Sequence, residues 1–406
     1  MRYDLIVIGM GLSGLMAAKT AADAGAKVLL VGKGTGGLCL FTASIDVMGT
    51  LSEGAAMAAE MPQWIERHPD HPYARVGWEG IREALDAFAA LFPPPYDFAP
   101  AGEGNCLLPT GVGTKRPTYL VPATMRGSVG LEKERTLLVG FQGFRDFYAG
   151  YAAAGLGCRG ENLTIPEIAN RNNSATSLAR LLESPPFREQ VAAEIVRRLH
   201  GETHVGFPAL LGLRNPMETL QDLEDRTNTR IFEIPVLPPS IPGMRIFHRF
   251  RQHLIARGAT FLLGSPVRRV LRDGTLCKAI EVHHPPVAQI YEADRFILAT
   301  GRFMGGGLCA DEEMIREPLM GLPLSACLPR RQWFERSFLE NREHAIHGVG
   351  VPTDGDLRPL DGGRPVSPNL WIAGTLLAHQ RWIDEKSREG IEIATGYRAA
   401  RKALAS

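Results

Sequence analysis

The chain is 406 residues long, with 45% apolar and 22% charged residues and a net charge of +1. This length exceeds what a single hydrophobic core usually supports, so we expect two domains. A net charge this close to zero provides no overall field to attract nucleic acid, an anionic membrane or an acidic partner, and the longest apolar runs are too short to span a bilayer.

The first 31 residues predict a strand–helix–strand unit. Residues 4–9 are apolar after the first position and end in glycine, which is typical of a buried parallel strand. An alanine-rich helix is expected over residues 12–24, with Gly25 as its C-cap. Residues 27–31 predict a second buried strand, so the three elements form a βαβ unit.

A glycine-rich turn joins the first strand to the first helix. Gly9, Gly11 and Gly14 have the Gly-x-Gly-x-x-Gly spacing, in the strand–turn–helix context that makes this motif specific. Gly9 permits the tight turn, Gly11 lets the backbone approach a phosphate, and Gly14 lets the helix pack close to the sheet. Leu12 and Ser13 begin the helix, so their N–H groups complete the predicted phosphate cradle.

The acidic residue that usually contacts an adenosine ribose is missing. Dinucleotide-binding proteins place Asp or Glu about 20 residues after the turn, but here the second strand is followed by Gly32 and Lys33. Either backbone groups hold the ribose, or no adenosine is present and Lys33 meets a terminal phosphate. A solvated loop lysine is the third interpretation.

The remaining chain predicts further elements of both kinds. Residues 57–92 look mainly helical, and residues 96–245 alternate between short strands and helices. The C-terminal part predicts a helix at 246–258, strands at 260–263, 267–271, 294–301 and 369–374, and a final helix at 389–403.

Two of these later strand ends would complete a flavin site. Thr300 and Gly301 end one strand, and Gly374 ends another. Together with the N-terminal glycine turn, this arrangement favours a flavin over a simple nicotinamide cofactor. Gly37 and Ser44, which follow the second strand, are also expected to contact the cofactor.

Nucleotide-binding patterns therefore lie at both ends of the chain. We expect an α/β protein with a Rossmann-like flavoprotein domain of the FAD/NAD(P)-binding type and an inserted α+β domain. The cofactor domain would comprise residues 1–60, 244–305 and 345–406. The inserted domain would comprise residues 61–243 with 306–344, and would bind substrate, cap the site or dock a partner.

Four positions are candidates for substrate chemistry. Lys115 and Arg116 place two cations beside a glycine-rich loop, where they could bind a phosphate ester or simply be solvated. Arg245 follows a proline-rich loop and could point into a cleft or belong to a hinge. His379 is the best-placed histidine for acid–base work. The sequence identifies no catalytic residue beyond these candidates.

Cysteine spacing bears on how electrons would leave the protein. None of the six cysteines lies within three residues of another, so no Cys-x-x-Cys pair for a metal, cluster or disulfide is present. We therefore expect reduced thiols and no metal site, with electrons passing from the flavin to another chain.

Several segments resemble the family of the B subunits of anaerobic glycerol-3-phosphate dehydrogenase, and the similarity covers nearly the whole chain. The most specific are Phe-Gln-Gly-Phe-Arg-Asp-Phe at 141–147 and Pro-Pro-Ser-Ile-Pro-Gly at 238–243. Other matching segments are the opening at 3–14, Ser-Ile-Asp-Val-Met at 44–48, His-Pro-Tyr at 71–73, Leu-Pro-Thr at 108–110, and 369–396.

This resemblance implies a function and partners. The family implies oxidation of sn-glycerol 3-phosphate to dihydroxyacetone phosphate, with electrons passed to a membrane quinone pool. It implies two partners, a larger flavin subunit and an iron–sulfur subunit associated with the membrane. We expect a cytoplasmic protein, held at the inner face of the membrane by those partners, because the first strand leaves no room for a signal peptide.

The resemblance also implies FMN as the cofactor. FMN lacks adenosine, which agrees with Gly32 at the acidic position. The glycine turn itself fits FAD better, so FAD is the alternative.

One segment departs from the family pattern. Flavoproteins of this kind carry a glycine-rich turn before the last helix, whereas residues 386–390 retain only Gly390. The cation Arg388 could stabilise negative charge on the reduced flavin in its place. Two other functions stay open: a non-catalytic electron-relay or assembly subunit, and a stand-alone FAD-dependent dehydrogenase or reductase of another substrate.

Overall fold

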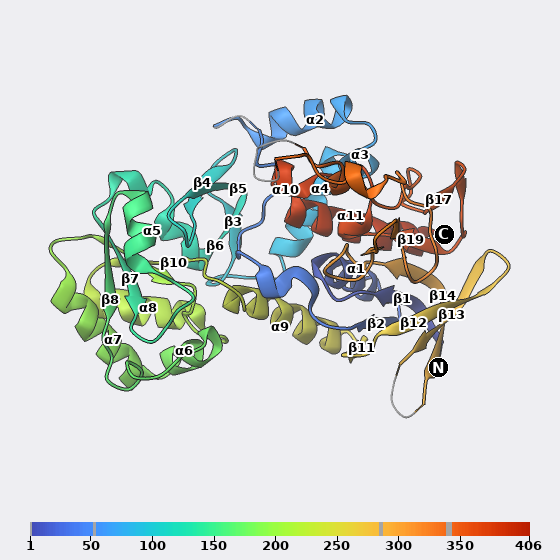
Figure 1. Ribbon diagram of the computed structural model, residues 1–406. Coiled ribbons are helices and arrows are strands. Elements are labelled where there is room, and N and C mark those ends of the chain that lie inside the picture. Colours follow the sequence, from blue (N-terminus) through green and yellow to red (C-terminus); the bar gives the residue numbers. More distant parts are fainter. Residues whose placement is uncertain (1, 52–53, 284–286, 338–342) are drawn as a thin grey trace. The chain divides into compact units, whose positions relative to one another are not determined.

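The computed structural model describes residues 2–51, 54–283, 287–337 and 343–406 (Figure 1). The chain forms two compact units. The first unit comprises the residues up to Gly37, Ala58–Leu91 and Arg249–Ser406, and the second comprises Leu38–Met57 and Phe92–His248.

The first unit is built on a mixed sheet with a parallel centre. Its strand order is β11-β2-β1-β14-β13-β12, and β19 also pairs with β14. The strands β1, β2, β11, β14 and β19 run parallel, whereas β12, β13 and β14 pair antiparallel. Their bounds are β1 Arg2–Ile8, β2 Val28–Gly32, β11 Thr260–Leu263, β12 Val267–Asp273, β13 Leu276–Val282, β14 Gln289–Leu298 and β19 Leu370–Ile372.

The helices of the first unit pack closely on one another where side chains are small. Helix α1 (Leu12–Asp23) contacts the last helix, α11 (Arg388–Ala405). A Cβ on Gly396 would overlap the backbone oxygen of Ser13, so only glycine permits this approach. The other helices that contribute to this unit are α2 Met57–Arg67, α3 Pro72–Val76, α4 Trp78–Ala89, α9 Ile241–Ala256 and α10 Trp382–Glu385.

The second unit contains a four-stranded sheet of order β10-β9-β7-β8 that is wholly parallel. Helices connect its successive strands, so this unit is α/β rather than the α+β domain that we expected, because parallel strands need a crossover between them. The bounds are β7 Thr136–Phe141, α5 Ala149–Leu156, β8 Arg159–Leu163, α6 Ala175–Leu182, α7 Pro185–Arg198, β9 His204–Pro208, α8 Pro216–Thr227 and β10 Arg230–Ile234.

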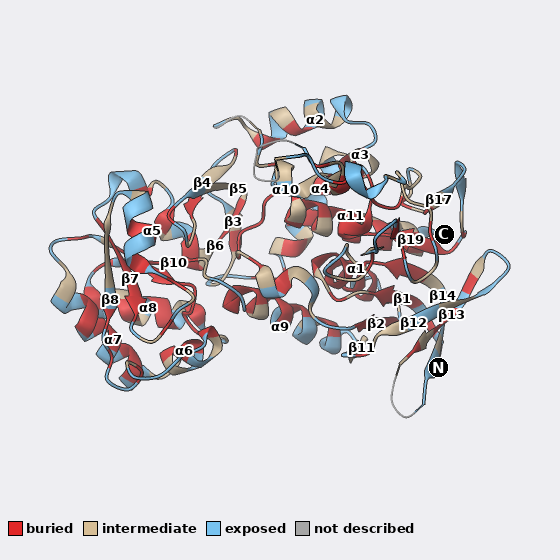
Figure 2. Cartoon of the chain, viewed as in Figure 1, coloured by how far each residue is buried: buried red, intermediate tan, exposed pale blue. Residues whose placement is uncertain are grey.

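Short antiparallel strand pairs complete both units. In the second unit β3 pairs with β6 and β4 with β5, and in the first unit β15 pairs with β16 and β17 with β18. Their bounds are β3 Phe98–Pro100, β4 Cys106–Pro109, β5 Lys115–Thr118, β6 Leu120–Pro122, β15 Cys309–Ala310, β16 Ile315–Arg316, β17 Leu360–Asp361 and β18 Arg364–Pro365. The main strands β1, β2, β7, β9 and β10 are largely buried, so each unit has its own core (Figure 2).

The observed division differs from the predicted domain bounds in four places. Residues 38–57 and 244–248 belong to the second unit, not to the cofactor domain, whereas 61–91 and the described part of 306–344 belong to the first unit. Helix α4 explains the difference at 61–91. Its apolar face is buried, it contacts α11, and the Phe88 ring lies 6.1 Å from that of Phe250. Amphipathic periodicity predicts such a helix but does not say which core it covers.

A buried ion pair lies in the core of the second unit. Arg245 donates two hydrogen bonds to Glu233, of 2.7 and 2.8 Å, and a third of 2.7 Å to the backbone oxygen of Gly212. Burial by itself lowers the pKa of Arg245, but the Glu233 carboxylate outweighs this effect and raises it above the ordinary value. The hypothesis that Arg245 points into a cleft is therefore contradicted, because its charge is fully engaged inside the core.

None of the described helices is both long enough and apolar enough to cross a membrane.

We predict that Arg245→Met destabilises the protein by about 3–5 kcal/mol, because it leaves the Glu233 carboxylate buried without a partner. Urea unfolding checks this value. Lys115→Met is the control, since the Lys115–Glu132 pair is exposed to solvent and should contribute little to stability. Equal losses in the two variants would contradict the assignment of a structural role to Arg245.

Candidate functional site

The turn between β1 and α1 depends on two glycines that lack room for a side chain. Gly9 has a φ of +119°, and its N–H donates to the backbone oxygen of Val31 at 2.8 Å. A Cβ on Gly9 would overlap the backbone oxygen of Ala299, and a Cβ on Gly14 would overlap that of Gly9. Without side chains at these two positions, the turn packs directly against the end of β14, and α1 packs directly against the turn.

Gly11 differs from its neighbours because it faces open space. It is the N-cap of α1 and provides no side-chain cap, and an added Cβ would meet no atom of the described chain within 4 Å. The first N–H groups of a helix have no partner within the helix. Leu12 and Ser13, the first residues of α1, therefore begin a site with the donors and the room that a phosphate needs.

A second glycine turn borders the same space. Gly36 has a φ of +59°, and a Cβ there would lie 2.8 Å from Cα of Gly11. A Cβ on the next residue, Gly37, would lie 3.8 Å from Nη1 of Arg388, the first residue of α11. The turn thus connects the phosphate cradle to the start of the last helix.

The ends of β14 and β19 complete the enclosure. The buried hydroxyl Oγ1 of Thr300 has no hydrogen-bond partner in the part of the chain that is described. At Gly301, with a φ of +68°, a Cβ would lie 3.7 Å from Oγ1 of Thr375. A Cβ on Gly374 would overlap Oγ of Ser13. The two strand ends and α1 thus converge, and Thr300 has a buried polar atom available to a ligand.

Gly32 has a steric explanation. A Cβ at this position would lie 3.1 Å from both N and Cγ of Met10, which is buried. An acidic side chain at the end of β2 would therefore displace Met10. Lys33 is exposed, and its Nζ lies so close to Gly306 that a Cβ on Gly306 would overlap it. The Lys33 side chain therefore reaches the glycine turn after Gly301.

Charged groups cluster on the first turns of α11. Arg388 donates to Glu389 through Nε at 2.9 Å and Nη2 at 2.5 Å, and its guanidinium lies 5.4 Å from the ring of Trp382. Glu389 is fully buried, as is Gly390. The positive charge predicted to act on a reduced flavin is therefore partly offset by Glu389.

Glu392 lies one turn further along α11. Burial raises the pKa of Glu392 to about 7, with Arg388 opposing the rise and Glu389 adding to it. Its Cγ lies 3.8 Å from the position of a Cβ on Gly374. A carboxyl group that is about half protonated at neutral pH is thus placed beside the Gly374 turn.

Three predicted site residues lie in the second unit, and each contacts an acidic side chain. Ser44 donates to Asp46 at 3.4 Å, and Arg116 pairs with the same carboxylate and donates to Thr42 at 3.1 Å. Lys115 pairs with Glu132 at 3.1 Å. The two cations predicted to bind a substrate phosphate therefore both have acidic partners.

Two histidines of the first unit differ in their surroundings. His379 is exposed, with a φ of +61°, and no carboxylate of the described residues lies within ion-pair distance of its ring. His347 instead has Nδ1 at 3.1 Å from Oδ2 of Asp384. The two partners are 37 residues apart, so no sequence spacing could have indicated their contact.

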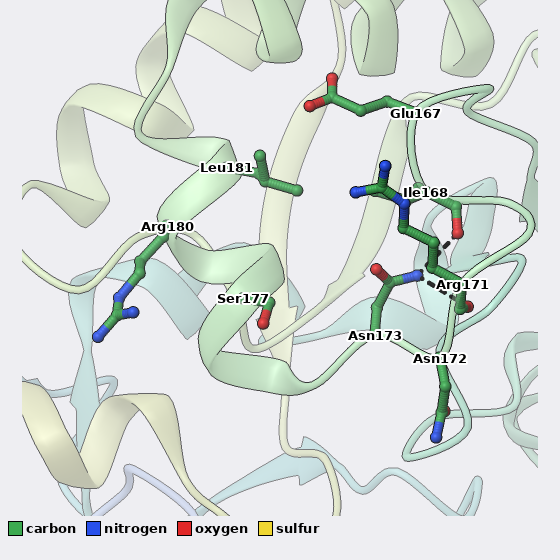
Figure 3. Close-up of a pocket in the computed structure, with 8 residues that line it drawn as sticks. All are labelled: Glu167, Ile168, Arg171, Asn172, Asn173, Ser177, Arg180 and Leu181. Carbon is green, nitrogen blue, oxygen red and sulfur yellow. Dashed lines mark hydrogen bonds between the residues drawn. The ribbon is translucent and has the colours of Figure 1, made fainter.

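The second unit also contains a cavity of about 470 Å³ between α6 and the loop before it (Figure 3). The guanidinium of Arg171 points toward this space, whereas Arg180 extends away from it (Figure 3). Asn173 directs its amide to backbone oxygens, among them Ile168 at 2.8 Å. The full lining is Glu167, Ile168, Arg171, Asn172, Asn173, Ser177, Arg180 and Leu181, and it includes none of the predicted site residues.

Within the described ranges, no group of three or more His, Cys, Asp or Glu residues is arranged to hold a metal ion. The six cysteines are free thiols.

Comparison with known proteins identifies the family of this chain. The model of the FAD binding domain family matches residues 4–389. The B subunit of a probable anaerobic glycerol-3-phosphate dehydrogenase of Halobacterium salinarum is 32% identical over 98% of this chain and 96% of its own length. The chain belongs to this family of B subunits, within the FAD binding domain proteins.

A second relative agrees with this assignment. The B subunit of the anaerobic glycerol-3-phosphate dehydrogenase of Vibrio cholerae is 29% identical over 100% of this chain and 97% of its own length. The resemblance predicted from the sequence is confirmed, and so is a flavin as the cofactor.

Solved structures resemble the chain more distantly. The 3-ketosteroid delta1-dehydrogenase from Sterolibacterium denitrificans matches with full coverage of both chains at 12% identity, with a TM-score of 0.47.

The residues of the cradle have the groups that a flavin cofactor needs. The uncapped start of α1 at Gly11 and the buried, available Oγ1 of Thr300 fit the phosphates and polar groups of such a cofactor. The family match is to an FAD binding domain, so it does not support the preference for FMN.

We predict that Gly11→Ala and Gly14→Ala both lose flavin but differ in stability. A Cβ on Gly11 enters only the space facing the phosphate donors, and as an N-cap change it should cost less than about 1 kcal/mol. A Cβ on Gly14 overlaps backbone and should cost about 1–3 kcal/mol or more. Flavin content and urea unfolding of the flavin-free proteins check this. Equal stability of the two variants would contradict it.

A second prediction concerns Glu392. An ordinary glutamate in the unfolded chain titrates near pH ~4.3, so a folded pKa of about 7 means that the folded protein holds the proton longer. The stability that this proton contributes is complete below the unfolded pKa and is lost as pH rises through the folded pKa.

Glu392→Gln removes that loss. Relative to the natural protein, the variant should therefore gain stability with rising pH, by up to roughly 3 kcal/mol in total. Urea unfolding of flavin-free protein at about pH 5 and about pH 8 measures the difference. A difference that does not change with pH would show that Glu392 titrates normally.

Proposed function

We propose that this chain is the flavin-binding B subunit of an anaerobic glycerol-3-phosphate dehydrogenase, which oxidises sn-glycerol 3-phosphate to dihydroxyacetone phosphate. The observation that carries the proposal is the match to the Halobacterium salinarum relative over 98% of this chain and 96% of that protein. The cradle in the first unit supports it, because a redox enzyme of this class needs a flavin held by its phosphates.

The cofactor of this proposal is FAD. The first N–H groups of α1 would hold its phosphates, and Thr300 and Gly301 would contact it from the end of β14. Since Gly32 carries no carboxylate and Met10 fills the adjacent space, the adenosine ribose would be held by backbone groups. When bound, the flavin accepts a hydride from the substrate carbon.

The proposed partners are a larger flavin subunit and an iron–sulfur subunit associated with the membrane, with quinone as the final acceptor. The sequence supports electron transfer to another chain because its cysteines are not spaced to hold a cluster. The Halobacterium salinarum relative is named as one subunit of its enzyme, which also supports an assembly of several chains.

A non-catalytic electron relay is the second candidate. The ion pairs of Lys115 and Arg116 favour it, since cations already paired with carboxylates bind a substrate phosphate less strongly. The relay and the dehydrogenase differ in whether substrate reduces the flavin of this chain.

Two measurements on the purified chain test the proposal. Extraction of the cofactor should yield FAD by mass, and anaerobic sn-glycerol 3-phosphate should bleach the flavin absorbance. Glycerol is the matched control and should bleach it far more slowly, because it lacks the phosphate. A flavin that dithionite reduces but glycerol 3-phosphate does not, alone or with co-purified partners, would contradict the dehydrogenase and support the relay.

A further inference from the structure

A histidine–aspartate pair lies in the first unit among the segments that form the cofactor cradle. His347, in the short turn Ala345–Gly348, has Nδ1 at 3.1 Å from Oδ2 of Asp384, on α10. The His347 side chain is 18% exposed and that of Asp384 31%, so neither is sealed in the core. Because the carboxylate engages Nδ1, Nε2 is the nitrogen that can exchange a proton.

Three sets of contacts tie this pair to the cradle. Arg302, which follows Gly301, donates to the backbone oxygens of Ile346 and His347. Val351 and the segment after Gly374 exchange hydrogen bonds, with Val351 N–H donating to Leu376 at 2.9 Å.

The third contact joins α10 to α11. Trp382, two residues before Asp384, lies under the guanidinium of Arg388 at 5.4 Å, and Arg388 is close to Gly37. Segments on both sides of His347 and the helix that carries Asp384 are therefore fixed to the three strand and helix ends that surround the predicted flavin site.

Other histidines of this region are less suited to proton transfer. The His71 ring is 3% exposed, its Nδ1 accepts from the Tyr73 N–H at 3.1 Å, and its Nε2 lies 3.3 Å from Glu385. Both of its nitrogens are thus engaged. His344 is buried, stacks edge-on against His347 at 5.3 Å and accepts from the Glu335 N–H at 3.0 Å through Nδ1.

We propose that His347 is the proton acceptor of the oxidation and that Asp384 is the positioning residue that holds its ring. This proposal rests on the proposed function. Oxidation of a secondary alcohol breaks an O–H and a C–H bond and forms C=O. The proton passes to Nε2 of His347, and the hydride, with its electron pair, passes to the flavin.

The test compares variants of the flavin-loaded protein in single-turnover reduction by sn-glycerol 3-phosphate without oxygen. His347→Gln should slow flavin reduction by about 10²–10⁴-fold, the usual contribution of a general base. Asp384→Asn should slow it by at least about tenfold, because the ring loses the partner that fixes its proton to Nδ1. Added imidazole should partly restore the rate of His347→Ala.

His253→Gln is the matched control. His253 also pairs with a carboxylate, with Nε2 at 2.7 Å from Asp23, but Asp23 ends α1 far from its glycine turn at the other end. Its rate should match that of the natural protein.

Two readouts separate catalysis from structure. Flavin content should be unchanged in every variant, as should the shift in flavin absorbance caused by 1,3-propanediol monophosphate, which lacks the hydroxyl to be oxidised. The reduction rate should rise with pH in the natural protein and stay flat in His347→Gln. If Gln at 347 prevents folding, the changed pH profile of Asp384→Asn decides.

The outcomes distinguish the two proposals. If no secondary alcohol reduces the flavin of the natural protein, the proposed function is overturned, and the role of His347 with it. If the flavin of the natural protein is reduced and His347→Gln has the same reduction rate and pH profile, only the role of His347 is overturned. Loss of substrate-analogue binding in both variants would make the pair structural, which also overturns it.

Discussion

The first unit depends on backbone segments that approach one another without side chains between them. Gly9 and Gly14 let β1, α1 and the end of β14 meet at one point, and Gly374 and Gly396 let β19 and α11 close on Ser13. Each added Cβ would overlap a neighbouring atom at these four positions. Gly11 is the exception. The space beside it stays open at the uncapped start of α1, where a cofactor phosphate would bind.

The glycine turn can be predicted from the sequence because its geometry is local. The positive φ of Gly9 and the contact of Gly14 with it involve residues five apart in the chain, and such short-range constraints appear in a motif. Gly32 is visible in the sequence as an anomaly, but its cause is not, since the steric contact with Met10 requires the packed sheet. The predicted bounds of the two units differ from the observed ones for the same reason, because α4 could cover either core.

The charged residues are the least predictable. The sequence places Arg245 either in a cleft or at a hinge, whereas it is paired with Glu233 inside the second unit. A sequence shows a cation and a proline-rich loop, but not the carboxylate that neutralises the cation from a strand elsewhere. The pair His347 and Asp384 shows the converse: Asp384 lies in the matching segment 369–396 but His347 lies in none, and the fold brings them together beside the cradle. These partners depend on tertiary packing, so sequence spacing carries no signal for them.

An experimental structure of the flavin-loaded protein tests the central claim most directly. The account predicts that the cofactor phosphates lie within hydrogen-bond distance of the N–H groups at the start of α1, with Thr300 Oγ1 also in contact with the cofactor. Phosphates bound elsewhere, with the space beside Gly11 filled by solvent or protein, would contradict it.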